Sequence, residues 1–208
     1  MGIKGFWHIY MINHWYSVVT DQLRILLTSG LYDACEEISI SAIGSQAERH
    51  LLEMYFINPN YSKLRFKYHS ERAEDFEFPA LRLIEADKSD YAGFYFHTKA
   101  VTRPYETVIS HWRSMLNEEV LNLWQRHYEN ICNGYDVSSV NYKASPNHFS
   151  GNFWWFNRKY INKCHPVDSM NLTWRYHAEQ WICTGKGKFW YPEFREPGDN
   201  IFKIQYKK

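Results

Sequence analysis

The sequence has no long apolar run, no clustered cysteines and no excess charge of one sign. Its longest apolar stretches are far shorter than the roughly 20 residues that a helix needs to cross a bilayer, so we expect no transmembrane segment. The 4 cysteines form no Cys-x-x-Cys pair and follow no apolar signal peptide, which predicts reduced thiols in a cytoplasmic protein. Because 24 Lys+Arg nearly cancel 23 Asp+Glu, we expect no nucleic-acid partner, and any bound anion needs a local site.

Internal repeats and low-complexity segments are also absent, whereas aromatic residues are abundant. A chain of 208 residues is long enough for one core, so we expect a single domain over residues 1–208. Phe, Trp and Tyr make up 18% of the chain, with 9 Trp and 16 Tyr. Trp and Tyr carry a polar atom that needs a partner when buried, so stacking on sugars or bases is one explanation. An aromatic-rich core is the other explanation.

The first half of the chain alternates strands and helices. Residues 6–13 are apolar and β-prone, residues 15–29 repeat apolar side chains at helical spacing before Gly30, and residues 38–44 have the pattern of a second strand. A strand, a helix and a strand in this order predict a βαβ unit. Further helices are expected at residues 46–55 and 78–88, and further strands at residues 64–68 and 92–97.

The second half begins with the longest expected helix, at residues 104–130. After it we expect a strand at 137–142, a strand-like segment at 147–156, helices at 157–164 and 176–183, and an irregular basic tail from Gly185. The whole pattern predicts an α/β fold. Its central sheet should be mixed but mostly parallel, with about six strands flanked by helices.

The buried strand at residues 92–97 ends abruptly in the polar residues His97, Thr98 and Lys99. Sheets of this class bind ligands at the carboxyl ends of their strands. His97 is a candidate metal ligand and Lys99 a candidate partner of phosphate oxygens, because a departing diphosphate must have its charge neutralised. A histidine bonded to the backbone beside a solvated lysine is the structural alternative.

A second polar cluster, in residues 147–152, contains His148, Ser150, Gly151 and Asn152. Its imidazole, hydroxyl and amide groups suit sugar hydroxyls, and glycine allows close backbone approach. The alternative is a bulged, buried strand.

A third cluster opens the helix expected at residues 176–183. His177 and Glu179 lie in its first turn, where a carboxylate could act as a base toward an acceptor hydroxyl or stabilise positive charge on a sugar ring. A glutamate in the first turn of a helix also has an ordinary capping role, so both interpretations remain open.

Read in order, these segments resemble a family of small glycosyltransferases from bacterial polysaccharide loci and large DNA viruses. The matching motifs are Tyr95-x-His97-Thr98-Lys99, a Trp-Arg helix, His148-Phe-Ser-Gly-Asn-Phe-Trp-Trp155, and Arg175-Tyr-x-x-Glu179-x-Trp-Ile182. The resemblance extends from Tyr10 to Ile182. It is close to the members from chlorella viruses that glycosylate the major capsid protein.

The resemblance implies a GT-A fold, a UDP-sugar donor, a manganese or magnesium ion, and a glycan or glycoprotein acceptor. The transferred sugar would be a hexose or deoxyhexose, with glucose or rhamnose favoured. Residues 149–152 are similar to a donor-binding segment of glycogenin-like retaining transferases, and residues 178–180 fall near their catalytic segment. The implied catalytic residues are therefore Glu179, His177 and Asn152.

The metal motif of the family, Asp-x-Asp, is replaced here by His97-Thr98-Lys99. The resemblance therefore leaves His97 as the implied metal ligand. Glu85, Asp87 and Asp90, just upstream, are the fallback ligands.

The same resemblance assigns a nucleotide-binding half to residues 1–100 and a sugar- and acceptor-binding half to residues 101–208. The end of the first strand would lie over the uracil, basic residues would contact the base, ribose or diphosphate, and the basic tail would close over the phosphates. The implied donor-binding residues are Met11, Ile12, Asn13, Trp15, Lys63, Arg65, Arg82, His97, Thr98, Lys99, His148, Ser150, Gly151, Asn152 and Lys186.

Three other functions fit parts of the sequence. A carbohydrate-binding module without chemistry would also use the aromatic residues, although such modules are mostly all-β. Nucleic-acid binding would use the basic and aromatic residues interleaved at 64–68. A zinc site would take ligands from four residues that lack the usual finger spacing: Cys164, His165, His177 and Cys183.

Overall fold

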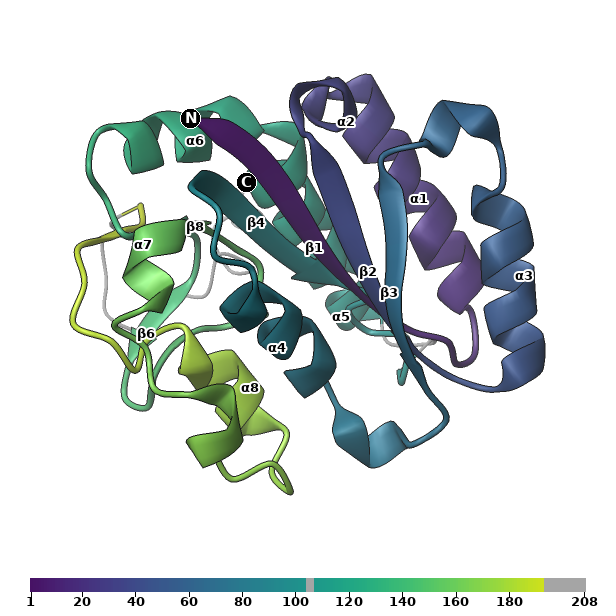
Figure 1. The fold of residues 1–208 in the computed structure, drawn as a ribbon. Coiled ribbons are helices and arrows are strands. Elements are labelled where there is room, and N and C mark those ends of the chain that lie inside the picture. Colours follow the sequence, from purple (N-terminus) through teal and green to yellow (C-terminus); the bar gives the residue numbers. More distant parts are fainter. Residues whose placement is uncertain (104–106, 193–208) are drawn as a thin grey trace.

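The computed structural model describes residues 1–103 and 107–192 and contains a seven-stranded central sheet (Figure 1). The strands lie in the order β3-β2-β1-β4-β8-β5-β9. Their bounds are Leu64–Ser70 for β3, Glu37–Ile43 for β2, Gly2–Tyr10 for β1, Tyr91–His97 for β4, Trp154–Asn157 for β8, Val137–Ser139 for β5 and Phe189–Trp190 for β9.

Strands β1 to β4 are parallel, so their carboxyl ends share one edge of the sheet. The register of β1 against β4 pairs His8 with His97. Strand β8 runs antiparallel to β4 and to β5. The loop that leads into β8 therefore reaches the same edge as the ends of β1 and β4, whereas the residues before β3 and β4 lie at the opposite, amino edge.

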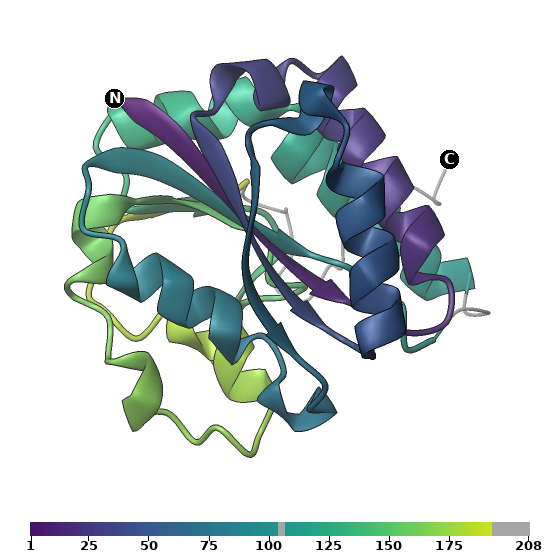
Figure 2. The ribbon, with the colours of Figure 1, turned by 45° about the vertical axis from the view of Figure 1, so that its right-hand side comes forward.

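Helices cover both faces of the sheet (Figure 2), because its strands are apolar on both sides. In β1 the side chains alternate: Trp7 and Ile9 belong to one apolar core, and Phe6 belongs to the other. The first core is closed by α1 (Trp15–Thr28), α2 (Leu31–Ala34), α3 (Gln46–Phe56), α5 (Thr107–Leu116) and α6 (Trp124–Cys132). The second is closed by α4 (Phe78–Ala86), α7 (Arg158–Ile161) and α8 (Tyr176–Trp181).

The predicted fold class is confirmed: the protein is an α/β fold with a mostly parallel sheet between layers of helices. The sheet has seven strands, one more than expected, because Phe189–Trp190 of the predicted irregular tail pairs with β5. Residues 193–208 of that tail lie outside the described residues. In the described part of the chain, no helix combines the length and apolarity needed to cross a membrane.

The helix predicted at residues 104–130 is divided into three pieces. Residues 104–106 lie outside the described residues, and between α5 and α6 the chain forms the π-helical segment η3 (Asn117–Asn122). Two side chains outside this segment donate hydrogen bonds to its backbone carbonyls. Trp155 Nε1 donates to the Val120 carbonyl at 2.9 Å, and His127 Nε2 donates to the Glu119 carbonyl at 3.0 Å. Packing against β8 thus replaces part of the ordinary helical bonding.

The segment predicted at residues 147–156 is also divided. Strand β7 (Asn147–Phe149) pairs with β6 (Tyr142–Ala144) in a separate two-stranded sheet, and a loop then leads into β8. The helix predicted at residues 157–164 is the shorter α7. Three 3-10 turns complete the fold: η1 (Pro59–Tyr61), η2 (Ala73–Asp75) and η4 (Val167–Ser169).

Candidate functional site at the carboxyl edge of the sheet

The carboxyl ends of β1 and β4 are bonded to each other. Thr98 Oγ1 accepts from the Tyr10 backbone N–H at 2.8 Å, and the Thr98 N–H donates to the His8 carbonyl at 3.1 Å. Beyond them, Asn13 Nδ2 donates to the Val101 carbonyl at 2.8 Å. Thr98 therefore joins the two strand ends. Because Thr98 is only 3% exposed, its role in this structure is structural, in contrast to the predicted contact with the donor.

Strained backbone is concentrated at this edge. Asn13, Ala100, Asn141 and Asn152 have positive φ angles of 54°, 74°, 60° and 56°. They lie in the loops that follow β1, β4 and β5 and in the loop that precedes β8. Such conformations cost of order 1 kcal/mol each and cluster at sites where the surrounding structure enforces one geometry. The loops around this edge are therefore held in defined positions.

The loop before β8 contacts the end of β4 through its backbone. His97 Nε2 donates to the Gly151 carbonyl at 3.0 Å. Gly151 has φ +98°, and a Cβ atom there would lie 2.6 Å from Leu116 Cδ1. Glycine is thus required both for the conformation and for the close packing. This contact brings two of the three polar clusters of the sequence together.

Asn152 lies inside this contact and is 0% exposed. Its Nδ2 donates to Glu77 Oε2 at 2.5 Å, and its Oδ1 accepts from Trp154 Nε1 at 2.7 Å. With no exposed surface, the Asn152 side chain does not reach a ligand in this conformation. In this structure Asn152 positions Glu77, and its catalytic and donor-binding role stays a prediction that would require the loop to move.

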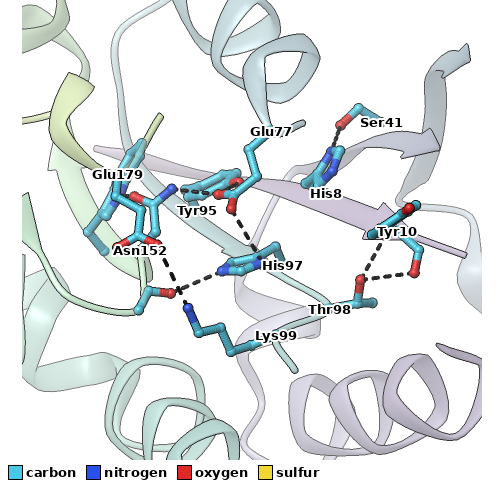
Figure 3. Close-up of polar contacts among 12 residues, drawn as sticks. His8, Tyr10, Ser41, Glu77, Tyr95, His97, Thr98, Lys99, Asn152 and Glu179 are labelled. Atoms are coloured by element: carbon cyan, nitrogen blue, oxygen red, sulfur yellow. Dashed lines mark hydrogen bonds and ion pairs between the residues drawn. The ribbon is translucent and has the colours of Figure 1, made fainter. Parts of the chain in front are cut away.

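Glu77 links the helix layer to this edge (Figure 3). It precedes the first residue of α4, where the helix dipole stabilises a carboxylate. Its Oε2 also accepts from the Tyr95 hydroxyl at 2.6 Å, and its Oε1 lies 3.8 Å from His97 Nδ1. The side chains of Glu77 and His97 keep 18% and 10% of their surface exposed, so this pair borders the solvent.

The two histidines beneath the edge are uncharged at neutral pH. Burial, followed by the charge of Lys99, lowers the pKa of His97 to about 3. Burial lowers the pKa of His8 to about 4, and its Nδ1 lies 2.9 Å from Ser41 Oγ. Burial, and then Glu77, raises the pKa of Tyr95 well above its usual value, so its hydroxyl remains a hydrogen-bond donor.

The third polar cluster reaches the same place through Lys99. Lys99 Nζ lies 3.9 Å from Glu179 Oε1 and 4.6 Å from the centroid of the Trp112 ring. The side chains of Lys99 and Glu179 are 15% and 18% exposed. Arg113 Nη1 donates to the Lys99 carbonyl at 3.0 Å, which brings a second cation close to this lysine. All three predicted clusters therefore meet at one edge of the sheet (Figure 3).

This arrangement combines two partly exposed carboxylates, one lysine and a neutral histidine. The carboxylates of Glu77 and Glu179 can accept hydrogen bonds or protons from hydroxyl groups. The ammonium of Lys99 can stabilise an anion that forms beside it. The site can thus hold a polyhydroxylated ligand next to a negatively charged leaving group.

The residues at this edge do not fit a bound metal. His97 donates through Nε2 to the Gly151 carbonyl, which leaves Nδ1 as its one possible ligand atom, and no group of three or more His, Cys, Asp or Glu within residues 1–103 and 107–192 could hold a metal ion. The fallback ligands precede β4 and so lie at the amino edge, where Asp87 is 2.8 Å from Lys4 Nζ and Asp90 is 3.0 Å from Lys159 Nζ. The fallback ligands thus lie away from this edge, and His97 as a metal ligand stays a prediction.

The remaining candidates from the metal and zinc predictions are also bonded elsewhere. Glu85 Oε1 accepts from the Val167 N–H at 3.1 Å. Cys164 and Cys183 are held as thiols, because burial raises their pKa to about 11 and about 12. The four proposed zinc ligands form no metal-holding group among the described residues.

Several basic residues predicted to bind the donor lie far from the site. Lys63 and Arg65 are at the start of β3, about 17 Å or more from its carboxyl end at roughly 3.3 Å per residue. Lys63 Nζ donates to the Asp33 carbonyl at 2.7 Å. Lys186 is exposed and lies two residues before Lys188, which bonds to Asp136 at the amino end of β5. These three are excluded from the site.

Arg82 lies along α4 and is paired with Asp168, with 2.7 Å between Arg82 Nη2 and Asp168 Oδ1. It therefore faces η4 instead of the carboxyl edge. Met11 and Trp15 are 2% and 5% exposed and belong to the core, so they cannot lie over a base. The half-buried Ile12 remains beside the edge.

The two other predicted histidines stabilise local turns. His148 Nδ1 donates to the Pro146 carbonyl at 2.6 Å, and His177 Nδ1 accepts from the Asn171 N–H at 3.1 Å. Ser150 is half-buried, and its N–H donates to the Asn141 carbonyl at 3.0 Å. Of these, Ser150 is adjacent to the contact between Gly151 and His97.

Four residues of the site were given no role by the sequence-based prediction, although the quoted motifs contain the second and third of them: Glu77, Tyr95, Arg113 and Gln22. Tyr95 lies two residues before His97 and so shares its face of β4, a relation that strand periodicity could have revealed. Gln22 is fully buried, and its Nε2 donates to the His97 carbonyl at 2.8 Å. Arg113 belongs to the Trp-Arg motif, whereas nothing in the local sequence distinguishes Glu77 from a solvated charge.

A family model described as "Domain of unknown function (DUF8361)" matches residues 6–173. No curated protein matches the sequence. Among solved structures, 4-diphosphocytidyl-2C-methyl-D-erythritol synthase from Anaerococcus prevotii DSM 20548 is similar with a TM-score of 0.51 and 10% identity, over 93% of this chain and 90% of that chain. This likeness shows a shared fold.

Two structures of LgtC are similar at lower scores. An active-site mutant of LgtC has a TM-score of 0.49 and 10% identity, over 90% of this chain and 72% of that chain. The galactosyltransferase LgtC in complex with donor and acceptor sugar analogs has a TM-score of 0.46 and 11% identity, over 88% of this chain and 66% of that chain.

Proposed function

The chain belongs to the DUF8361 family, a domain of unknown function, and we propose that it is a glycosyltransferase that takes a sugar from a nucleoside diphosphate donor. The α/β fold, the meeting of three polar clusters at the carboxyl edge and the resemblance of those clusters to small glycosyltransferases support this proposal. Each cluster alone has a structural explanation. Their meeting point is where sheets of this class bind ligands.

The pairing of Lys99 with Glu179 is the observation that carries the proposal. Lys99 lies two residues beyond the carboxyl end of the central strand β4 and is only partly exposed, so its charge is poorly screened. We assign to it the stabilisation of the diphosphate as the bond to the sugar breaks, with Arg113 adding positive charge behind it. Glu179 would accept the proton of the acceptor hydroxyl or stabilise charge on the sugar ring.

Finer features of the proposal come from the sequence resemblance. The nucleotide is UDP, held near Ile12 and Asn13, and the sugar is a hexose or deoxyhexose, with glucose or rhamnose favoured. The sugar would lie against Ser150 and Gly151. The acceptor is a glycan or glycoprotein, such as a viral capsid protein. Residues 1–100 would mainly hold the nucleotide, and residues 101–208 the sugar and acceptor.

A donor screen tests the proposal. UDP release from a panel of UDP-sugars is measured with and without manganese, because the resemblance implies this ion and the described residues do not hold it. We expect release from at least one donor. Lys99→Ala should reduce it by about 100-fold or more, the usual effect of losing one transition-state charge partner.

Lys186→Ala is the matched control, since it removes an exposed lysine at the opposite edge of the sheet and should leave UDP release unchanged. Equal UDP release by Lys99→Ala and wild type would contradict the role of Lys99. Binding of glycans without binding of UDP would favour a carbohydrate-binding module instead.

A further inference from the structure

We propose that Glu77 and His97 form a pair of hydrogen-bond acceptors that takes two neighbouring hydroxyl groups of the transferred sugar. The inference rests on the proposed function and adds a specificity-determining pair to it. It starts from one juxtaposition: Glu77 Oε1 lies 3.8 Å from His97 Nδ1 (Figure 3), where the half-buried Glu77 side chain meets the largely buried His97 ring.

The carboxylate of Glu77 is fixed on one side only. Its Oε2 accepts hydrogen bonds from the Tyr95 hydroxyl at 2.6 Å and from Asn152 Nδ2 at 2.5 Å. Among the described residues, no donor bonds to Oε1. Two short bonds at one oxygen orient the group, and the other oxygen remains available toward the site.

The imidazole of His97 is fixed in a complementary way. Because a carbonyl can only accept, the bond from Nε2 to the Gly151 carbonyl places the ring hydrogen on Nε2. In the neutral ring, Nδ1 then carries a lone pair. The ring is held between Tyr95, stacked at 6.2 Å between centroids, and Phe153, in edge contact at 5.2 Å. Its Nδ1 therefore points at Glu77 without freedom to turn away.

Two acceptors that face each other repel unless a donor lies between or beside them. Adjacent hydroxyl groups of a sugar ring supply two donors at short spacing, one for each acceptor. The neighbouring charges fit the same ligand, because Lys99 and Glu179 are paired beside His97 and both act on it electrostatically, so that a phosphate could follow the sugar there. A pair that accepts hydroxyls beside a lysine that holds phosphate matches a nucleotide sugar.

The test is the variant Glu77→Gln. Its amide oxygen can accept both bonds from Tyr95 and Asn152, while its amide nitrogen can donate to His97 Nδ1. The variant thus keeps the hydrogen bonds from Tyr95 and Asn152. It also replaces the unbonded acceptor Oε1 by an N–H group that bonds to His97, so that neither atom is available to a sugar hydroxyl. Glu85→Gln is the matched control, near the end of the α4 helix that Glu77 precedes and toward the opposite edge, where Gln can still accept from the Val167 N–H.

Affinities for UDP and for the best UDP-sugar of the donor screen are measured by isothermal titration. Glu77→Gln should weaken binding of the UDP-sugar by roughly 10- to 100-fold, as expected for a lost hydrogen bond to a charged group, and should leave UDP affinity unchanged. Unchanged UDP affinity also establishes that the variant is folded. Equal weakening of UDP and UDP-sugar, or no weakening, would overturn the inference.

Donor analogues that each lack one hydroxyl provide a second test, which does not depend on how the variant folds. Wild type should lose affinity for the analogues that lack either of the two bound hydroxyls, and Glu77→Gln should show a smaller further loss for them. If every deoxy analogue binds wild type as well as the parent donor, the acceptor pair has no role. If wild type binds no nucleotide sugar at all, the proposed function fails first, and this inference fails with it.

Discussion

The buried amide of Asn152 gives the sharpest prediction about what holds the site together. Asn152→Ala removes the bond to the Glu77 carboxylate, worth about 1.5–3 kcal/mol, and leaves the buried Trp154 N–H without its acceptor, at a cost of about 1–3 kcal/mol. Alanine at φ +56° adds about 1 kcal/mol of strain. We expect a loss of about 3.5–7 kcal/mol in the free energy of unfolding.

Urea denaturation followed by tryptophan fluorescence measures this loss, and Asn152→Gly separates its parts. The glycine variant loses the same hydrogen bonds without the strain of a left-handed alanine, so it should be about 0.5–1 kcal/mol more stable than the alanine variant. A total loss below about 1 kcal/mol for Asn152→Ala would refute the reasoning, since at least one of the two bonds would then contribute nothing.

Three further predictions concern the same edge. Ala100→Gly should raise the free energy of unfolding by about 0.5–1 kcal/mol, because φ is +74° there, and thermal unfolding would show it; a lower Tm would contradict it. Gly151→Ala should lower the free energy of unfolding by about 2–4 kcal/mol, because the new Cβ meets Leu116 and the alanine must adopt φ +98°. Urea denaturation measures this, and an unchanged midpoint would count against the packing. The pKa values of His8 and His97, about 4 and about 3, lie below the unfolded value of 6.5, so the unfolded state binds more protons and stability should fall as pH drops from 6.5 toward 4. The slope for these two residues approaches about 2.7 kcal/mol per pH unit near pH 5 and is about half of that at pH 6.5, and a flat stability profile between pH 6.5 and 4 would contradict it.

The main strands, and the polar residues that follow them, were predictable because the apolar runs in the sequence are continuous. Residues 92–97 predict a buried strand that delivers His97 and Lys99 to a ligand edge, and β4 does so. Pairing over long distances was not predictable in this way. The insertion of β8 between β4 and β5 depends on contacts that no local pattern encodes, and it is this pairing that brings Gly151 to His97.

Some wrong predictions could have been avoided with the same physical rule. Lys63 precedes a predicted strand, as do Asp87 and Asp90, so in a parallel sheet all three belong at the amino edge. Glu77 could not have been found, because its role arises only where α4 packs over β4 and meets Tyr95 and Asn152.

A crystal structure of the chain with bound UDP would test the central claim most directly. We predict that the diphosphate lies at the carboxyl edge of the sheet, within ion-pair distance of Lys99 Nζ, with the uracil beside Ile12 and Asn13. A nucleotide bound elsewhere on the protein, with Lys99 still paired only to Glu179, would contradict the assignment of this edge as the site of sugar transfer.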